Sequence, residues 1–171
     1  MQRAISWVET LTEKIGQAAS WLSTLLVVVV CYDVFTRYLL NASSVAVQEL
    51  EWHLFAAMFL LAMAYGFKHN RHVRVDVFYN RFSTRTQSII NFWGTVAFLI
   101  PFAIVVVWAS GKFVWVSFSI RETSPDPGGL PARYLLKAII PISFILLGLQ
   151  GLAFAIKTAM HLWGKPEDSK Q

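Results

Sequence analysis

Four long apolar runs limit what this chain can fold into more than any other feature of its sequence. An α-helix needs about 20 apolar residues to cross the hydrocarbon core of a bilayer. Runs of that length lie at about residues 15–40, 45–67, 86–111 and 134–156. The connections between them are too short for a soluble domain. We therefore expect an all-α integral membrane protein, in which residues 1–171 form a single membrane domain of four transmembrane helices.

The composition and the distribution of charge agree with this expectation. Only 15% of the residues are charged and 56% are hydrophobic, whereas a soluble domain carries about 25% charged residues. If the N-terminus lies inside, ten of the 15 Lys and Arg residues fall on the inner side, as the positive-inside rule requires. Both termini should then be cytoplasmic. The basic excess follows from this topology and from contact with anionic membrane lipid, so it gives no reason to expect a nucleic-acid partner.

The first residues of the chain indicate a further helix at the membrane surface. Ala4, Val8, Leu11 and Ile15 fall at helical spacing on one face, and polar residues lie opposite them. This pattern predicts a short amphipathic interfacial helix over about residues 3–14. A frayed polar tail is the alternative. A cleaved signal peptide is not expected, because acidic residues interrupt its basic region.

A group of charged residues is expected at the outer ends of the first three spans. Asp33 and Arg37 are four residues apart near the end of the first span, and this order of acid and base favours a helical ion pair. Glu49 and Glu51 lie in the first turns of the second span, and Lys112 follows the third. The five side chains should therefore lie at a similar depth.

Three interpretations of this group stay open. The acids near the start of the second span can be favoured by the positive end of its helix dipole. Arg37 or Lys112 can instead meet Glu49 or Glu51 in a buried polar bridge, between helices or to a partner protein, because charged groups within spans usually face protein. Catalysis or ion transport by the group is the third interpretation.

The sequence predicts neither an enzyme nor a cofactor or metal bound by this chain. The centres of the four runs contain no charged residue and no histidine, whereas secondary transporters usually bind substrate near the membrane midplane. His53 and His161 fall toward opposite sides of the membrane, so the two cannot hold one haem. His69 and His72 have ligand-like spacing, but the neighbouring basic residues would repel a cation. The lone Cys31 allows no disulfide within the chain.

Four short motifs between residues 47 and 131 have a recognisable pattern. They are Val-Gln-Glu-Leu-Glu (47–51), Ala-Tyr-Gly-Phe-Lys (64–68), His-Val-Arg-Val-Asp (72–76) and Asp-Pro-Gly-Gly-Leu-Pro (126–131). Together with the four spans, these motifs make the chain resemble the small (Q, DctQ-like) membrane subunit of tripartite ATP-independent periplasmic (TRAP) transporters. One position departs from the family pattern. Many members carry an acid pair or an Arg just after the acidic position, where this chain has Leu50, Glu51 and Trp52, so a role tied to that Arg is not carried over.

The resemblance implies a division of labour among three proteins. A large membrane subunit carries the substrate and sodium, and a soluble periplasmic protein captures the substrate, typically an organic acid such as a carboxylate. The small subunit packs beside the large one in the bacterial inner membrane and helps to receive the binding protein. No cofactor is then expected in this chain, and sodium belongs to the large subunit.

The resemblance also gives roles to two groups of residues. His72, Arg74 and Asp76 would form a signature at the inner interface, where Arg74 touches lipid headgroups and Asp76 pairs with a base. Ordinary solvation at the interface is the alternative for this signature. The candidate contacts with the binding protein lie in the outer loop: Arg121, Glu122 and Asp126.

Two other functions remain as alternatives. The chain can be a self-contained channel or small exporter, most plausibly an oligomer of four-helix units. It can also be a membrane redox subunit, although the histidines are poorly placed for haem. Flux through the protein alone would favour the first alternative, and a haem absorbance band would favour the second.

Overall fold

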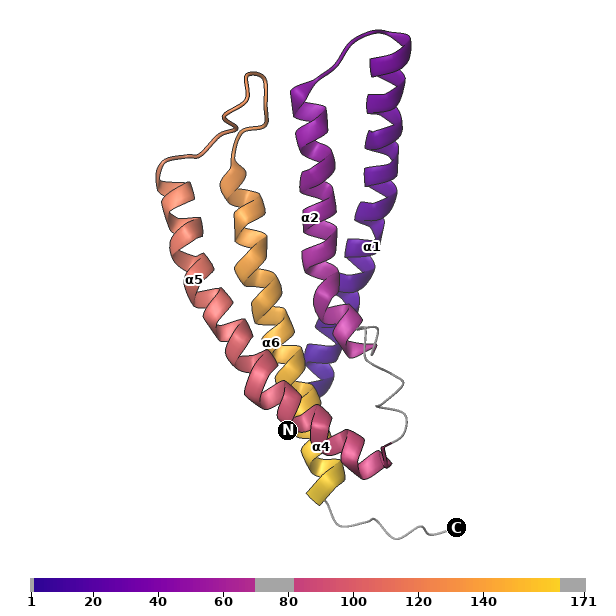
Figure 1. Ribbon diagram of the computed structural model, residues 1–171, viewed down its shortest axis with the longest axis vertical. Helices are drawn as coiled ribbons and strands as arrows, with labels where there is room; N and C mark the ends of the chain where they lie inside the picture. The colour runs from indigo at the N-terminus through magenta and orange to yellow at the C-terminus, as the bar shows by residue number, and fades with distance from the viewer. Residues whose placement is uncertain (1, 70–81, 164–171) are drawn as a thin grey trace.

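The computed structural model describes residues 2–69 and 82–163, and all regular secondary structure in this part is helical. Its elements are α1 (Gln2–Leu39), α2 (Val45–Lys68), α4 (Thr84–Gly94), η1 (Thr95–Leu99), α5 (Ile100–Ser119) and α6 (Arg133–Trp163). α4, η1 and α5 follow one another without a break and count as one span, Thr84–Ser119. The described chain therefore has four helices that are long and apolar enough to cross a membrane. The predicted all-α fold with four spans is confirmed (Figure 1).

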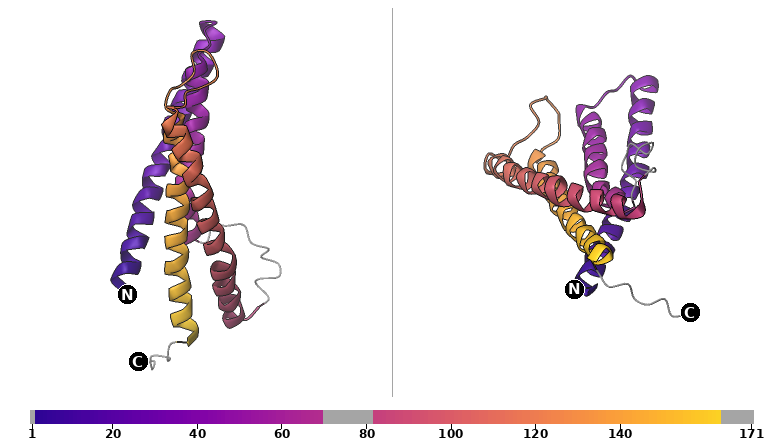
Figure 2. Two further views of the ribbon diagram at one scale, coloured as in Figure 1. Left: turned by 90° about the vertical axis from the view of Figure 1, so that its left-hand side faces the viewer. Right: turned by 60° about the horizontal axis from the view of Figure 1, so that its bottom comes forward.

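The four spans form an open row rather than a closed bundle. α2 packs against both α1 and α6, and α5 packs against the other side of α6, while α1 also touches α6. The start of α1 and the end of α6 share one end of the molecule, here called the terminal end (Figure 1). The connections 40–44 and 120–132 share the opposite end, here called the hairpin end. Toward the hairpin end the α1–α2 pair and the α5–α6 pair separate (Figures 1 and 2).

The N-terminal segment differs from its expected form. Residues 3–14 are the first turns of the continuous helix α1, not a separate helix. Their buried face carries Ile5 and Thr12, whereas Ala4 is exposed. Thr12 can face inward because its hydroxyl donates a hydrogen bond to Oε1 of the buried Gln150, 3.0 Å away on α6. These turns therefore pack against protein, and their place in the membrane interface stays a prediction.

The third span is longer than predicted and changes its helical register. It begins at Thr84 and ends at Ser119, so Lys112 lies inside the helix rather than after it. At η1 the backbone makes one π turn, in which Ile100 N–H donates to Thr95 C=O. Pro101 explains this turn, since proline has no N–H and its ring clashes with the carbonyl four residues earlier in a regular α-helix. α4 consequently inclines away from the axis of α5 (Figure 1).

The tightest packing lies toward the terminal end. Ala64 of α2 and Leu146 and Leu147 of α6 form a small core. Gly16 of α1 lets the ring of Tyr65 on α2 approach so closely that a Cβ at Gly16 would lie 2.4 Å from Tyr65 Cγ. Most other large apolar side chains are exposed, which suits a chain whose solvent is lipid rather than water.

Replacing Gly16 by alanine should therefore destabilise the α1–α2 pair. The added methyl group collides with the tyrosine ring, and overpacking of this kind costs about 1–3 kcal/mol. The measurement is the temperature at which the detergent-solubilised protein loses its monodisperse peak in size-exclusion chromatography. Gly66→Ala is the matched control on α2, because no atom lies within 4 Å of the added carbon. Equal effects of the two substitutions would contradict this packing.

Candidate functional site

The carboxylate of Glu49 is the centre of the polar network at the hairpin end. Glu49 lies in the second turn of α2 and is only 4% exposed. It accepts hydrogen bonds from the Ser124 hydroxyl, from Leu130 N–H at 2.6 Å and from an Arg133 guanidinium nitrogen at 2.9 Å. Because all three donors belong to the chain between α5 and the first turn of α6, one side chain of α2 fastens the whole α5–α6 connection.

The sequence of this connection explains how it presents its donors. Ser124 N–H donates to Leu130 C=O at 3.0 Å, which closes the segment into a loop. Within it, Gly129 N–H donates to Asp126 C=O at 3.0 Å, and Gly128 takes the positive φ of 80° that this turn requires. A Cβ at Gly129 would lie 2.8 Å from Glu49 Oε2. The Pro-Asp-Pro-Gly-Gly run is thus a turn built to admit a carboxylate.

A second ion pair holds the two ends of the connection together. Glu122 pairs with Lys137 in the second turn of α6, and Glu122 C=O accepts a hydrogen bond from Arg133 N–H at 3.0 Å. The Lys137 ammonium lies 4.1 Å from the ring centre of Phe113 on α5. Lys137, helped by Arg133, holds the pKa of Glu122 below its usual range.

The predicted bridge between helices has a different cation from those expected. Arg133 pairs with Glu49 and lies 5.6 Å from the ring centre of Trp52, so it holds two residues of α2 at once. Arg37 pairs instead with the buried Asp33 on its own helix, as their spacing predicted. Lys112 is exposed within α5 and makes no ion pair in the described part of the chain.

The remaining predicted residues take different positions. Glu51 is partly buried, and its Oε1 finds no hydrogen-bond partner within residues 2–69 and 82–163. Arg121 and Asp126 are exposed on the connection, so both stay candidate contacts with another protein. The carboxylate of Glu122 instead forms an ion pair with Lys137. The signature His72, Arg74 and Asp76 lies outside the described residues.

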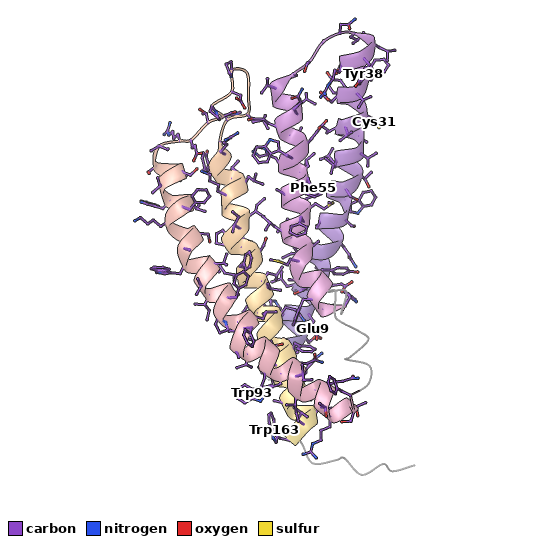
Figure 3. The ribbon with its side chains drawn as sticks, in the orientation of Figure 1. Glu9, Cys31, Tyr38, Phe55, Trp93 and Trp163 are labelled. Atoms are coloured by element: carbon purple, nitrogen blue, oxygen red, sulfur yellow. The ribbon has the colours of Figure 1, made fainter. Side chains whose placement is uncertain are left out.

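Sequence reasoning missed a second network, at the terminal end. Glu9 of α1 pairs with Lys157 of α6, and Glu13 of α1 pairs with Lys68 of α2 at 2.5 Å. His69 Nε2 lies 3.1 Å from the same Glu13 carboxylate. Figure 3 labels Glu9 at this end of the molecule. The sequence did contain a signal for this network. Two acids lie four residues apart before the first apolar run, and basic residues end the second and fourth runs.

Most of the ion pairs in the described structure belong to these two networks and therefore lie at the two ends of the row. They join α1 to α2 and α6 at one end, and α2 to the α5–α6 connection at the other. In both networks each of these carboxylates faces a cation of the same chain. This chemistry fixes helices relative to one another and requires no bond to be made or broken.

Glu49→Gln should loosen the α5–α6 connection. The amide keeps the shape but loses the charge, which leaves Arg133 without its anion, and hydrogen bonds to charged groups contribute about 1.5–3 kcal/mol. Hydrogen exchange of backbone amides in residues 122–132 should accelerate roughly 10-fold or more. Glu51→Gln is the control, because that carboxylate takes no part in the network. Unchanged exchange in Glu49→Gln would show that the connection is held by other contacts.

The Glu122–Lys137 pair should also give the connection a dependence on acid. Because folding lowers the pKa of Glu122, the pair stabilises the fold above the usual carboxylate range, and this contribution is lost as the pH falls through the lowered value. Exchange in residues 120–132, corrected for intrinsic rates, should stay constant from about pH 5 to 8 and rise below about pH 4. Glu122→Gln should reduce the step, and the part that remains should be lost in the double variant with Glu49→Gln, because the charge of Glu49 also holds this connection. A step of unchanged size in Glu122→Gln would contradict the contribution of the pair.

Comparison with known proteins gives one family and one curated relative. Residues 26–160 match the family described as "Tripartite ATP-independent periplasmic transporters, DctQ component". The chain is also 27% identical, over 160 residues, to "Isethionate TRAP transporter permease protein DctMQ" of Oleidesulfovibrio alaskensis. That similarity covers 90% of this chain but only 25% of the relative, so this chain spans about a quarter of the relative's length. The Glu49 network lies within the family match, whereas Glu9 and Glu13 precede it.

Proposed function

Because the chain belongs to the DctQ component of tripartite ATP-independent periplasmic transporters, we propose that it is the accessory small permease subunit of a secondary transporter of this kind. It lies in the bacterial inner membrane with both termini in the cytoplasm. A large membrane subunit carries the substrate, an organic acid, together with sodium, and a periplasmic binding protein delivers the substrate. This chain acts as scaffold and not as enzyme, and it holds no cofactor of its own.

The observation that carries this proposal is the set of hydrogen-bond partners of the buried Glu49 carboxylate. A carboxylate that bound substrate or a transported ion would need free acceptor positions facing a pathway. The Glu49 carboxylate instead accepts from Ser124, Leu130 and Arg133 of its own chain. This buried acid at the hairpin end therefore serves architecture, and this supports a substrate pathway on another subunit.

The open row of helices supports a large partner within the membrane. A row exposes two broad apolar faces, and its outermost helix α5 carries side chains such as Trp108, which is 82% exposed. The relative is about four times as long as the region that matches this chain. Its name, DctMQ, combines the letter M of the large subunit with the letter Q of the small one. A small subunit fused to a large one must lie beside it, which supports the same arrangement here.

The hairpin end supports contact with the binding protein. The connection between α5 and α6 is held at Glu49 and Lys137, so it presents Arg121 and Asp126 on a defined backbone. A docking surface gains affinity when its backbone is ordered before binding. We assign these two exposed residues, rather than Glu122, to that contact.

Paired purification and transport assays test the proposal. Tagged full-length chain should co-purify with a large polytopic membrane protein, and uptake into proteoliposomes should need both chains and the binding protein. The substrates to compare are isethionate, which the relative's name gives, and small carboxylates. Flux through liposomes that hold this chain alone would favour the oligomeric channel instead. Full transport after its deletion would contradict the scaffold role.

Within that assay, Glu49→Gln should lower the maximal transport rate or the yield of the complex. The apparent substrate constant should stay within about twofold, because the carboxylate does not face substrate. Glu51→Gln provides the matched control on the same helix. A change confined to the substrate constant would place Glu49 in the substrate pathway and contradict the assignment.

A further inference from the structure

Helix α4 has its polar and apolar faces arranged opposite to those of a helix in a water-soluble bundle. Its apolar side carries Ile89, Ile90 and Trp93, preceded by Phe82, and all four side chains are exposed. The more buried side carries three polar residues, Gln87, Ser88 and Asn91, beside Phe92. A helix in water buries its apolar face and exposes its polar face. The exposed face of α4 therefore requires an apolar environment.

The length of the third span places α4 at a membrane surface. Thr84–Ser119 contains 36 residues, which corresponds to about 54 Å of helix, whereas the hydrocarbon core is about 30 Å thick. Part of this helical segment must therefore lie outside the hydrocarbon. The π turn at η1 separates α4 from α5 and lets α4 incline away from the axis of the span (Figure 1).

Three observations favour lipid over a protein as the partner of this face. The exposed face continues the apolar surface of the span, where Phe98 is 76% exposed. Trp93 and Trp163 both lie exposed at the terminal end, as Figure 3 shows, and tryptophan is enriched at membrane interfaces. Arg85, in the first turn of α4, is exposed where an anionic headgroup can reach it.

From these observations we infer that α4 is an interfacial anchor. It lies in the headgroup region of the leaflet at the terminal end, with Ile89 and Trp93 toward the acyl chains and Arg85 toward the phosphates. The edge-to-face contact of Phe92 with Trp163 joins this anchor to the end of α6. The anchor thereby fixes the depth and tilt of the α5–α6 pair. The inference depends on the chain spanning a membrane and not on its role in transport.

Spin labels on single cysteines test the inference directly. Cys31→Ser removes the native cysteine, and Ile89→Cys or Trp93→Cys then places a label on the apolar face. The full-length protein is placed in nanodiscs of phosphatidylethanolamine and phosphatidylglycerol. Collisions of the label are measured with oxygen, which concentrates in lipid, and with a water-soluble nickel complex. Labels at both positions should collide several-fold more with oxygen than with nickel.

Three further labels give the scale and the control. Phe102→Cys marks the lipid-facing span, and Asp126→Cys marks the aqueous connection. Ser88→Cys lies on the opposite face of α4, and its label should collide less with oxygen than the label at position 89. Two results would overturn the inference. Labels at 89 and 93 that meet nickel as often as the label at 126 would place the face in water. Labels shielded from both reagents would show that protein covers it.

Discussion

The hydrogen bonds to the Glu49 carboxylate hold together a part of the structure that packing alone leaves open. The α1–α2 and α5–α6 pairs are close at the terminal end and separate toward the hairpin end (Figure 1). Glu49 joins them there because it accepts from three donors of the α5–α6 connection. A buried carboxylate is costly unless it is paired, and here the pairing fixes α2, the connection and α6 in one arrangement.

The charged networks at the two ends leave the apolar faces of the row free. In water, an open row with so few buried side chains would not be stable, because apolar burial drives folding. In a bilayer, lipid covers these faces and helix association depends on close packing and polar contacts instead. The same openness suits a subunit that works beside a larger protein, since its faces are available without any rearrangement.

Part of the candidate site followed from local sequence, and part depended on contacts that no local pattern contains. The Asp33–Arg37 pair was predicted correctly, because both residues lie on one helix with a spacing that makes them neighbours. The cation that pairs with Glu49 was not among those considered. Arg133 is 84 residues away in the sequence, and only the position of α6 beside α2 brings it near. The Glu9 and Glu13 pairs were missed for the same reason.

The sequence by itself determined the four membrane spans, the all-α fold and the family, because hydrophobic length and short motifs are local properties of the chain. The tertiary structure decided the order of the helices in the row and the partner of each buried charge. It also decided that α4 turns its apolar side outward. These features depend on which helices become neighbours and on where Pro101 shifts the helical register. They are set by packing between segments far apart in the chain, which periodicity within one segment cannot reveal.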